Sequence, residues 1–314
     1  MYKYYNLYTN KSTLQIIAFC AIISLVIDMD KYFKLNNNFI LFHYTSDEHP
    51  NANHFKLHTH EWYEVYYFID GEGSFKIEGN SYTLEKNSVF IMRPNESHYV
   101  DINLNKPYTR LSVHFDPAIF ENLYCNDALL KPFTDRDRGQ LNQYLPKDFI
   151  SKNYIQIFNN MILPVEDRVI QVTSYILPLL NEIYLSFKER NVPMPKSETA
   201  VQRIISYINQ NCCQKLTLET ISKEFFISKS QLCRVFKKAT GSTVWHYITV
   251  KRLFIAKEML LNGISPTKVS ADCGFNDYTT FYRAYAKQFG IPPQKSLIYK
   301  QESNLKAYNN TCRR

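Results

Sequence analysis

The sequence predicts a multidomain α+β protein in which a β-rich amino-terminal part precedes an all-helical carboxy-terminal part. Three observations support this prediction. Residues 39–115 contain short runs of β-branched and aromatic residues that are separated by turn residues. Residues 200–298 contain a helix-compatible segment that recurs after 49 residues. The chain of 314 residues is also longer than the ~100–200 residues of a usual domain.

The amino terminus carries an apolar run, residues 14–27 (LQIIAFCAIISLVI), behind Lys3 and Lys11. Its 14 residues fall short of the ~20 that a membrane-spanning helix needs, and no obvious small-residue cleavage site follows it. A signal-like segment, a buried helix and a spurious extension all remain open. Because Met29 begins a sequence typical of a protein start, we predict that residues 1–28 are an extension outside the folded domains.

Five short strands are expected in the amino-terminal part, and glycines and asparagines between them suit hairpin turns. Many short strands joined by such turns favour a β-barrel or a sandwich. The expected strands are residues 39–45, 63–69, 74–79, 88–94 and 109–115.

Helix-compatible stretches broken by prolines follow these strands. The longest is residues 166–189, where apolar side chains recur at i, i+3 and i+4 spacings. Residues 191–199 (NVPMPKSET) then form a polar segment with two prolines, which is typical of a linker. We therefore expect helices that trail the β-barrel and a domain boundary at this linker.

Charge divides the chain at the same place. Residues 1–195 hold 18 basic and 22 acidic side chains, a net charge of −4. Residues 196–314 hold 19 basic and 7 acidic side chains, a net charge of +12, and the two parts together give the formal +8 of the chain. This asymmetry indicates a carboxy-terminal half that meets a polyanion such as nucleic acid, although a solvated lysine-rich face has the same composition.

Composition also argues against several classes of function. The seven cysteines are scattered and form no pair of CxxC knuckles, which disfavours a disulfide framework or a structural zinc site and fits a reducing cytosol. The eight glycines form no phosphate-binding loop, so ATP or dinucleotide chemistry is not expected. We expect no cofactor.

The carboxy-terminal repeat predicts two helix-turn-helix units. Residues 232–241 (LCRVFKKATG) align with residues 281–290 (FYRAYAKQFG) at a spacing of 49, which places Arg234 and Arg283 in register. The segment before each copy aligns at a spacing of 48. Each unit is therefore expected to contain a short helix, a turn and a second helix.

Capping residues mark the expected helices. Thr217 is suited to begin the first helix, and Ser228 with Gln231 forms an S-x-x-Q capping box for the second. Gly241 and Gly290 suit the ends of the second helices. Apolar side chains of the second helix in the first unit share one face, which leaves four polar residues mainly outward: Ser230, Arg234, Lys237 and Lys238.

The second helix of such a unit can enter a DNA major groove. Arginine suits guanine because its two donors face O6 and N7, and lysines on the same helix suit phosphates. A helical bundle with an ordinary cationic surface is the alternative, but matched outward arginines in both units favour DNA. Residues 244–261 contain no Gly or Pro, and as one helix of ~27 Å they would separate the two units rigidly.

These segments resemble the AraC/XylS family of transcription regulators. The resemblance covers about a hundred residues, in segments 216–241 (LTLETISKEFFISKSQLCRVFKKATG), 250–263 (VKRLFIAKEMLLNG) and 269–295 (VSADCGFNDYTTFYRAYAKQFGIPPQK). It implies two helix-turn-helix units joined by a linker helix. It also implies base-facing residues at Ser230, Cys233, Arg234, Thr279, Thr280 and Arg283; Gln231, Lys237, Lys238 and Lys287 complete the expected DNA-binding set.

The sequence departs from the family pattern at a few positions. Ser222 and Ser270 stand where the first helix of each unit usually has alanine. Ala286 stands where a phosphate-contacting lysine is usual. The last departure reduces the affinity expected of the second unit and leaves the expected fold unchanged.

Histidines gather at the other end of the chain, in a pattern similar to that of cupins. His58, His60, Glu64 and Gly71 fit the spacing HxH-x3-E-x6-G, and His98 follows in the segment RPNESH. In cupins two His, a Glu and a later His converge inside a small β-barrel. Neutral imidazoles with one carboxylate suit Fe, Mn, Ni or Zn.

Several roles for this cluster remain open. The second cupin motif is matched only in part, because Arg93 and Asn95 replace its usual Pro and Gly and Ile102 its usual Asn. The cluster could anchor an effector, bind a metal, serve an enzyme or stabilise the barrel. AraC-type sensor domains resemble the first case, so an effector site is expected at His58, His60, Glu64, Arg93 and His98; any metal would take His58, His60, Glu64 and His98.

The expected domains follow from these boundaries. They are an extension (1–28), a cupin-like sensor and dimerisation domain (29–190), a linker (191–199), a double helix-turn-helix DNA-binding domain (200–298) and a basic tail (299–314). The helix at 166–190 resembles the family's dimerisation region, and its packing on its own barrel is the alternative.

The sequence therefore predicts a cytoplasmic transcription regulator, an activator and not an enzyme. Its expected partners are a double-stranded DNA operator, a small-molecule effector such as a sugar or other metabolite, and a second copy of itself, with no membrane. The alternative is a metal-dependent cupin enzyme that carries an appended DNA-binding module.

Overall fold

The computed structural model describes residues 32–36, 39–51, 55–120, 126–163, 167–190 and 199–296. The predicted extension at 1–28, all of the linker at 191–199 except its last residue, and the basic tail at 299–314 lie outside these described residues.

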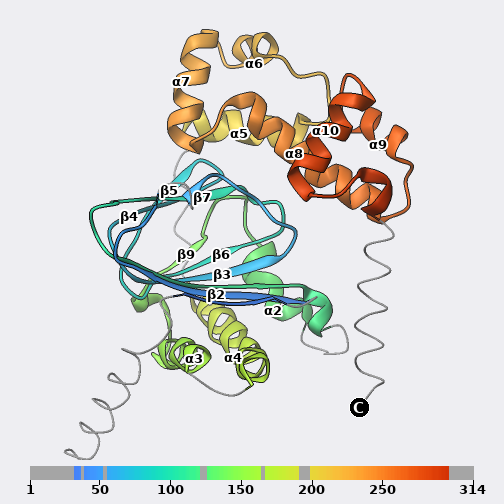
Figure 1. The fold of residues 1–314 in the computed structure, drawn as a ribbon. Coiled ribbons are helices and arrows are strands. Elements are labelled where there is room, and N and C mark those ends of the chain that lie inside the picture. Colours follow the sequence, from blue (N-terminus) through green and yellow to red (C-terminus); the bar gives the residue numbers. More distant parts are fainter. Residues whose placement is uncertain are drawn as a thin grey trace, which may run out of the picture.

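The amino-terminal strands form two antiparallel sheets that face each other (Figure 1). The smaller sheet has the order β5-β4-β7 and the larger has the order β1-β2-β8-β3-β6-β9. The strands are β1 (Tyr32–Asn36), β2 (Ile40–Asp47), β3 (Tyr63–Asp70), β4 (Gly73–Ile77), β5 (Asn80–Thr83), β6 (Val89–Met92), β7 (His98–Ile102), β8 (Tyr108–Phe115) and β9 (Gln143–Tyr144).

Alternation along β3 divides the buried side chains between two cores. Tyr66 and Phe68 point between the sheets and pack there with Phe75 of β4. Val65 and Tyr67 point the other way, toward the helices. Glu64 shares the inner face with Tyr66 because the two residues are two positions apart in the strand. A carboxylate is thereby placed among aromatic side chains.

Helices cover the outer face of the larger sheet (Figure 1). They are α2 (Asn126–Thr134), α3 (Asn153–Ile162) and α4 (Arg168–Glu189), with short 3-10 turns at Pro117–Phe120 and Pro146–Asp148. The Asp167 side chain caps α4 by accepting a hydrogen bond from the Ile170 amide. The expected helix at 166–189 is thus confirmed over Arg168–Glu189.

Each of the five expected strands is found, with bounds that differ by a few residues. The short strands β1, β5, β7 and β9 were not expected. Each has five residues or fewer, and their places are fixed by pairing with β2, β4 and β6. Non-local pairing of this kind overrides weak local strand preference.

The carboxy-terminal half is helical (Figure 1). Its helices are α5 (Ala200–Asn211), α6 (Leu218–Glu224), α7 (Lys229–Thr240), α8 (Val244–Leu261), α9 (Pro266–Asp272) and α10 (Tyr278–Phe289), and a 3-10 turn follows at Pro293–Lys295. Helix α8 has the bounds expected from sequence. Among the described residues, no helix is long and apolar enough to cross a membrane.

The repeat spacing is confirmed residue by residue. Helices α7 and α10 are offset by 49 residues at both ends, and α6 and α9 are offset by 48. The expected fold, a β-rich amino-terminal domain followed by a helix-turn-helix region, is confirmed.

Local caps explain why these helices begin and end where they do. The Thr217 and Ser228 side chains accept the amide hydrogen bonds of Thr220 and Gln231. Gly241 ends α7 in the left-handed region at a φ of 69°, as expected. The capping box at α7 is only half formed, because Gln231 makes no return bond to Ser228 and lines a cavity instead.

Each helix-turn-helix unit has its own core. We call the first unit α5–α7 with the amino-terminal half of α8, and the second unit the carboxy-terminal half of α8 with α9 and α10. Leu232 and Phe236 of α7 pack on Ile248 in the first unit. Phe281 and Tyr285 of α10 pack on Leu253 in the second. Helix α8 contributes to both cores, so it joins the units rigidly.

Candidate functional site

The outward face of α7 carries the residues expected to read DNA. Ser230, Cys233, Arg234 and Lys237 are exposed, while Leu232 and Phe236 are fully buried on the opposite face. At 100° per residue the four exposed residues lie within about one third of the helix circumference. Helix α7 therefore presents one polar strip that contains a single arginine.

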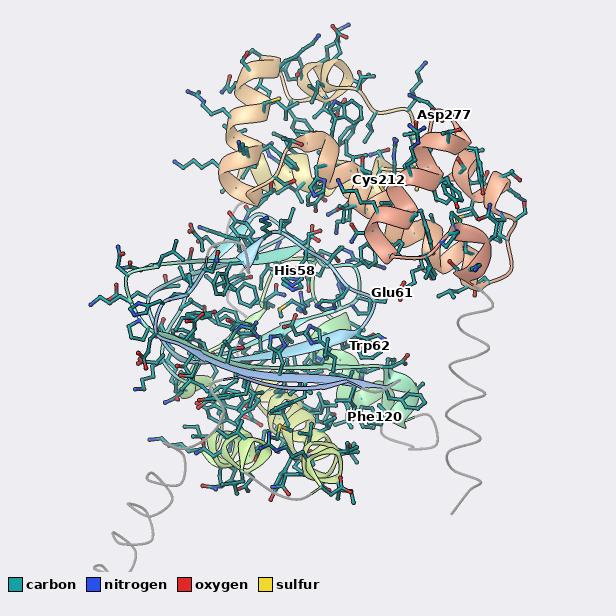
Figure 2. The ribbon with its side chains drawn as sticks, viewed as in Figure 1. His58, Glu61, Trp62, Phe120, Cys212 and Asp277 are labelled. Carbon is teal, nitrogen blue, oxygen red and sulfur yellow. The ribbon has the colours of Figure 1, made fainter. Side chains whose placement is uncertain are left out.

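The second unit repeats this strip. Thr279 and Arg283 of α10 are exposed at the positions that correspond to Ser230 and Arg234. The Asp277 carboxylate, at the start of α10 (Figure 2), accepts hydrogen bonds from the Thr280 amide and hydroxyl, each at 2.7 Å. Thr280 is thus exposed, but its hydroxyl already caps the helix.

A flanking strip differs between the two units. Gln231 and Lys238 of α7 line a cavity between that helix and the sensor strands β4 and β5. The corresponding residues of α10, Thr280 and Lys287, are exposed to solvent. The expected DNA-binding residues therefore fall into one outward strip that both units share and one flank that faces the sensor only in the first unit.

A cluster of imidazoles surrounds one carboxylate inside the β-rich domain. The Nε2 atoms of His60, His98 and His114 lie 2.8, 3.1 and 3.4 Å from the same Glu64 Oε2 atom. Ser112 donates a hydrogen bond of 2.6 Å to the other oxygen, Oε1. Glu64 and His98 are almost fully buried. Three imidazole nitrogens therefore converge on one carboxylate oxygen.

Backbone carbonyls orient the imidazole rings. The Nδ1 atom of His60 donates to the Trp62 carbonyl at 2.8 Å, and that of His98 donates to the Glu96 carbonyl at 2.7 Å. With the proton on Nδ1, a neutral ring presents a lone pair at Nε2. His98 Nε2 makes no well-aligned hydrogen bond despite its closeness to Glu64. The Glu64 carboxylate, and the Nε2 atom of each ring that is neutral, can therefore accept a hydrogen bond or bind a cation.

The charges of the cluster depend on one another. Burial raises the pKa of Glu64, but the nearby His114 charge and hydrogen bonds from the surrounding histidines outweigh this and hold it well below its usual value. Burial and the neighbouring His114 charge lower the pKa of His60 to about 4. For His98 burial lowers the pKa, but the adjacent Glu64 carboxylate, whose Oε2 lies 3.1 Å from His98 Nε2, outweighs burial and raises it. The Glu64 carboxylate is ionised and is the negative centre of the site.

His114 was not among the residues expected in the cluster, and His58 is peripheral. His114 lies opposite Glu64 in the register of β3 and β8, so strand pairing brings it in. The alternation of the 109–115 segment was visible in the sequence, but the register was not. His58 is exposed, and its ring centroid lies 4.4 Å from that of His98 and 6.2 Å from that of His60 (Figure 2).

Arg93, the remaining residue of the expected effector site, lines a cavity without histidines. That cavity lies between the β-rich domain and α5. The Arg93 guanidinium donates to the Thr134 carbonyl at 3.3 Å. The structure therefore brings together His60, Glu64 and His98 and separates Arg93 from them.

A buried ion pair joins the β-rich domain to α8. Lys251 Nζ lies 2.5 Å from Glu78 Oε1 and donates to the Asn95 carbonyl at 2.6 Å. The Tyr247 hydroxyl and the Asn209 amide donate to the other Glu78 oxygen. Both charged side chains are buried, with residual exposures of 4% for Glu78 and 6% for Lys251. We call this group the latch.

The latch shares a loop with the imidazole cluster. Residues 93–98 supply the Asn95 carbonyl to Lys251, the Ser97 amide to Glu78 and the His98 ring to Glu64. The Asn95 amide also donates to the His60 carbonyl at 2.9 Å. One short loop therefore contacts both the candidate effector site and the helix that joins the two DNA-reading units.

Comparisons with known proteins agree with this two-part architecture. Residues 43–148 match the family model described as an AraC-like ligand binding domain, and residues 221–297 match the model of a helix-turn-helix domain.

Curated relatives match both parts together. The Msm operon regulatory protein of Streptococcus mutans serotype c is 23% identical over 267 residues, which cover 82% of this chain and 93% of the relative. The lactose operon transcription activator of Staphylococcus xylosus is 22% identical and covers 70% and 78%. The HTH-type transcriptional activator RhaS of Escherichia coli O1:K1 / APEC is 21% identical and covers 78% and 88%.

These findings give no support to the alternative of a cupin enzyme. A ligand-binding domain, a double helix-turn-helix and relatives that match across both lead to one assignment. The chain is a transcription regulator of the AraC family, a family whose members bind DNA and small-molecule effectors.

Proposed function

We propose that this regulator activates transcription by placing α7 and α10 in successive major-groove faces of its operator. The observation that carries the proposal is the register of Arg234 and Arg283, which are exposed on helices held at opposite ends of one rigid α8. Helix α8 spans ~27 Å at 1.5 Å per residue, which suits faces about one DNA turn, ~34 Å, apart. Two relatives are named as transcription activators, which supports activation and not repression.

Each arginine is proposed to read a guanine through its paired donors. Around them, Ser230, Cys233 and Thr279 lie on the same outward strips and reach neighbouring bases. Lys237 is exposed on the strip and suits a phosphate. Gln231, Lys238, Thr280 and Lys287 belong to the flanks, and only the pair on α10 is clear of the sensor.

Genome-wide mapping of bound DNA, followed by hydroxyl-radical footprinting of the recovered site, tests this proposal. The expected footprint has two protected stretches on one face of the duplex, about one turn apart. Protection of a single stretch that Arg283→Ala leaves intact would show that only the first unit reads DNA. The operon recovered would also indicate the chemical class of the effector.

The imidazole cluster is the proposed effector site. Hydroxyl groups of a sugar or similar metabolite would donate to the Glu64 carboxylate and to the Nε2 atom of the neutral His60 ring. His58 is exposed and His60 retains 20% of its side-chain exposure, so the cluster meets solvent on one side. Isothermal titration of the sugars metabolised by the mapped operon, against the parent protein and Glu64→Gln, would test the assignment.

A divalent transition metal is a second candidate for the same cluster. The ligand atoms of His60, Glu64 and His114 all lie within 4.8 Å of one another, and His98 Nε2 also faces Glu64. Nitrogen donors with one carboxylate suit Fe, Mn, Ni or Zn. A bound metal would supply charge to hold an anionic or hydroxylated effector. Metal analysis of tag-free protein decides between the two, and His114→Ala should release a metal held by this set.

Effector and DNA binding are proposed to be linked through loop 93–98. An effector that moves His60 or His98 displaces the Asn95 carbonyl and the Ser97 amide, which hold the latch. The latch in turn holds Lys251 and Tyr247 of α8. Binding would therefore shift the population in which both reading units are free to meet DNA.

A homodimer through α4 is also proposed. The solvent face of α4 carries Val169, Ile170, Leu177 and Leu185, which are 44%, 63%, 37% and 37% exposed. Three of them recur at intervals of seven or eight residues, which is the spacing of an apolar stripe along a helix. Light scattering of Ile170→Glu with Leu177→Glu should show a monomer if α4 is the interface.

The proposed regulator has no catalytic step and acts in the cytoplasm, where operator DNA is found. Its relatives are named as regulators, which supports the first point. Cys212, Cys213, Cys233 and Cys273 are free thiols, which suits a reducing compartment. The proposed domain boundaries are those at 29–190, 191–199 and 200–298.

A further inference from the structure

A second cavity, separate from the imidazole cluster, lies between the β-rich domain and α5. Its volume is about 360 Å³, and polar side chains dominate its walls. The β-rich domain contributes Asn80, Arg93 and Arg138, and α5 contributes Gln202, Ser206 and Gln210. Pockets of ~300–1,000 Å³ hold small molecules, so this cavity suits a ligand of metabolite size.

Two arginines face this cavity without a balancing acid. Within the described chain, neither Arg93 nor Arg138 forms a salt bridge. Arg93 Nε is buried and has no hydrogen-bond partner. Among the residues that the structure describes, Arg138 donates only to the carbonyls of Pro94 and Asn95, at 3.3 and 3.1 Å. Burial, and next the charge of Arg138, lower the pKa of Arg93, so the two cations repel each other there.

The acids that border the cavity offset only part of this positive charge. Glu78 is already neutralised by Lys251 and bound by Tyr247 and Asn209. Asp137 is exposed and forms no salt bridge among the described residues. An anion between the two guanidinium groups would receive charge-assisted hydrogen bonds from their terminal nitrogens.

The opposite wall supplies neutral hydrogen-bonding groups. Gln210 and Ser206 of α5 contact each other at 3.4 Å, and Gln202 binds Asn80. Amides and hydroxyls of this kind suit the hydroxyl groups of a polar ligand. The cavity therefore combines an anion-binding wall on the sensor with a hydroxyl-binding wall on the first DNA-reading unit.

We propose that this interdomain cavity binds a small hydroxylated metabolite that carries a phosphate or carboxylate, with the oxyanion on Arg93 and Arg138. Its ligand contacts the sensor and α5 at once and lies beside the latch residues Glu78 and Asn209. Occupancy stabilises the docked arrangement of the two domains, because the ligand binds that arrangement and not the separated one. The regulator thus has a second ligand site that lies apart from the imidazole cluster and shares loop 93–98 with it.

Thermal melting of the full chain with glucose 6-phosphate tests this site. Glucose and sodium chloride of equal ionic strength serve as controls for the sugar and for the charge. A saturable rise in Tm is expected with glucose 6-phosphate and with gluconate, and none with glucose. Arg93→Gln and Arg138→Gln should each weaken the binding at least tenfold, and Arg93→Lys should restore part of it.

Matched variants separate this site from other basic surfaces. Arg203→Gln changes an exposed arginine of α5 outside this cavity and should leave the binding unchanged. Arg234→Gln with Lys237→Gln removes charge from the proposed DNA surface and should do the same. Loss of the Tm rise in that double variant, or no saturable rise with either anion, would overturn the proposal. DNA binding by the Arg93 variant, measured separately, tells whether the proposed function stands when this site fails.

Discussion

The two helix-turn-helix units have nearly the same local structure and very different surroundings. Helices α7 and α10 begin on a side-chain cap, run for 12 residues and end on a left-handed glycine. Yet a Cβ on Gly241 would lie 3.0 Å from the Tyr99 ring of the sensor, whereas Gly290 has nothing within 4 Å. The first unit is docked and the second is free at the same position.

The contacts that hold each unit differ in kind. The first is held by the latch, a buried and fully hydrogen-bonded ion pair. The second touches the sensor through Lys257 and Glu61, a partly exposed pair at 2.9 Å near the rim of the sheets (Figure 2). The duplicated sequence therefore forms two similar units, of which the first is joined to the β-rich domain by a buried ion pair and the second by a partly exposed one.

The largest effect on this asymmetry is expected from Lys251→Ala. Removing one partner of a buried pair leaves the other charge unpaired and costs ~3–5 kcal/mol. Hydrogen-exchange protection of α5 and of the β4–β5 turn should fall, because Gly79 in that turn packs on Ile205. Lys257→Ala is the control and should cost at most ~1 kcal/mol, as partly exposed pairs do. Equal effects of the two substitutions would remove the distinction between a docked and a free unit.

Lowering the pH should destabilise loop 93–98, which contacts the first unit through Lys251. Glu96 is fully buried and accepts hydrogen bonds from both terminal nitrogens of Arg136, at 2.8 and 2.7 Å. It also accepts a hydrogen bond from the Arg93 amide and so orders loop 93–98. Burial raises its pKa, but Arg136 and backbone amides lower it to about 2. A carboxyl with a depressed folded pKa stabilises above its unfolded pKa, and that stability disappears as the pH falls through the folded value.

The loss should therefore occur between pH ~4.5 and 2 and amount to about 3 kcal/mol. Thermal unfolding of the parent and of Glu96→Gln across this range measures it. The parent should lose stability relative to the variant as the pH falls. A constant difference between the two proteins would show that Glu96 is not the titrating group.

Arg234→Ala and Arg283→Ala compare the two reading helices directly. Each should weaken operator binding by ~1–3 kcal/mol and relax base preference in its own half of the site. Because the buried latch holds the first unit, a Lys251→Ala background should change the affinity lost with Arg234→Ala more than that lost with Arg283→Ala. Unchanged footprints in both single variants would refute the assignment of α7 and α10 as the reading helices.

The turns of the two units predict opposite responses to substitution. Phe226 has a φ of +53° and is 95% exposed, while the corresponding Gly274 has a φ of +78°. A Cβ on Gly274 would lie 2.5 Å from the Cys213 carbonyl oxygen. Phe226→Gly should raise the free energy of unfolding by ~0.5–1 kcal/mol, and Gly274→Ala should lower it by ~1–2 kcal/mol. Urea denaturation of both variants measures the difference, and equal signs would contradict the equivalence of the turns.

Much of the helical half could be predicted from sequence because its signals are local. Thr217, Ser228 and Gly241 act within one turn of the chain, and the bounds of α8 follow from the absence of Gly and Pro. The outward position of Arg234 follows from helical periodicity alone. Because the repeat aligns the two units, the same predictions apply to the helices of the second unit.

The sites in the β-rich domain could be predicted only in part. The HxH-x3-E pattern identified His60 and Glu64, which are only four residues apart in the sequence. That pattern missed His114, and the expected effector site wrongly grouped Arg93 with the histidines, because the distance of each from Glu64 depends on strand pairing and loop course. Local preference says little about pairing between strands that are far apart in sequence.

The sequence by itself determined that two matched readers follow a β-rich sensor with a histidine cluster. Only the tertiary structure decided that Lys251 meets Glu78, that His114 joins the cluster and that Arg93 faces a second cavity. The physical reason is range: caps and periodicity act over a few residues, whereas the latch and the cluster join groups that only folding brings together. Their desolvation and pairing energies exist only in the folded chain.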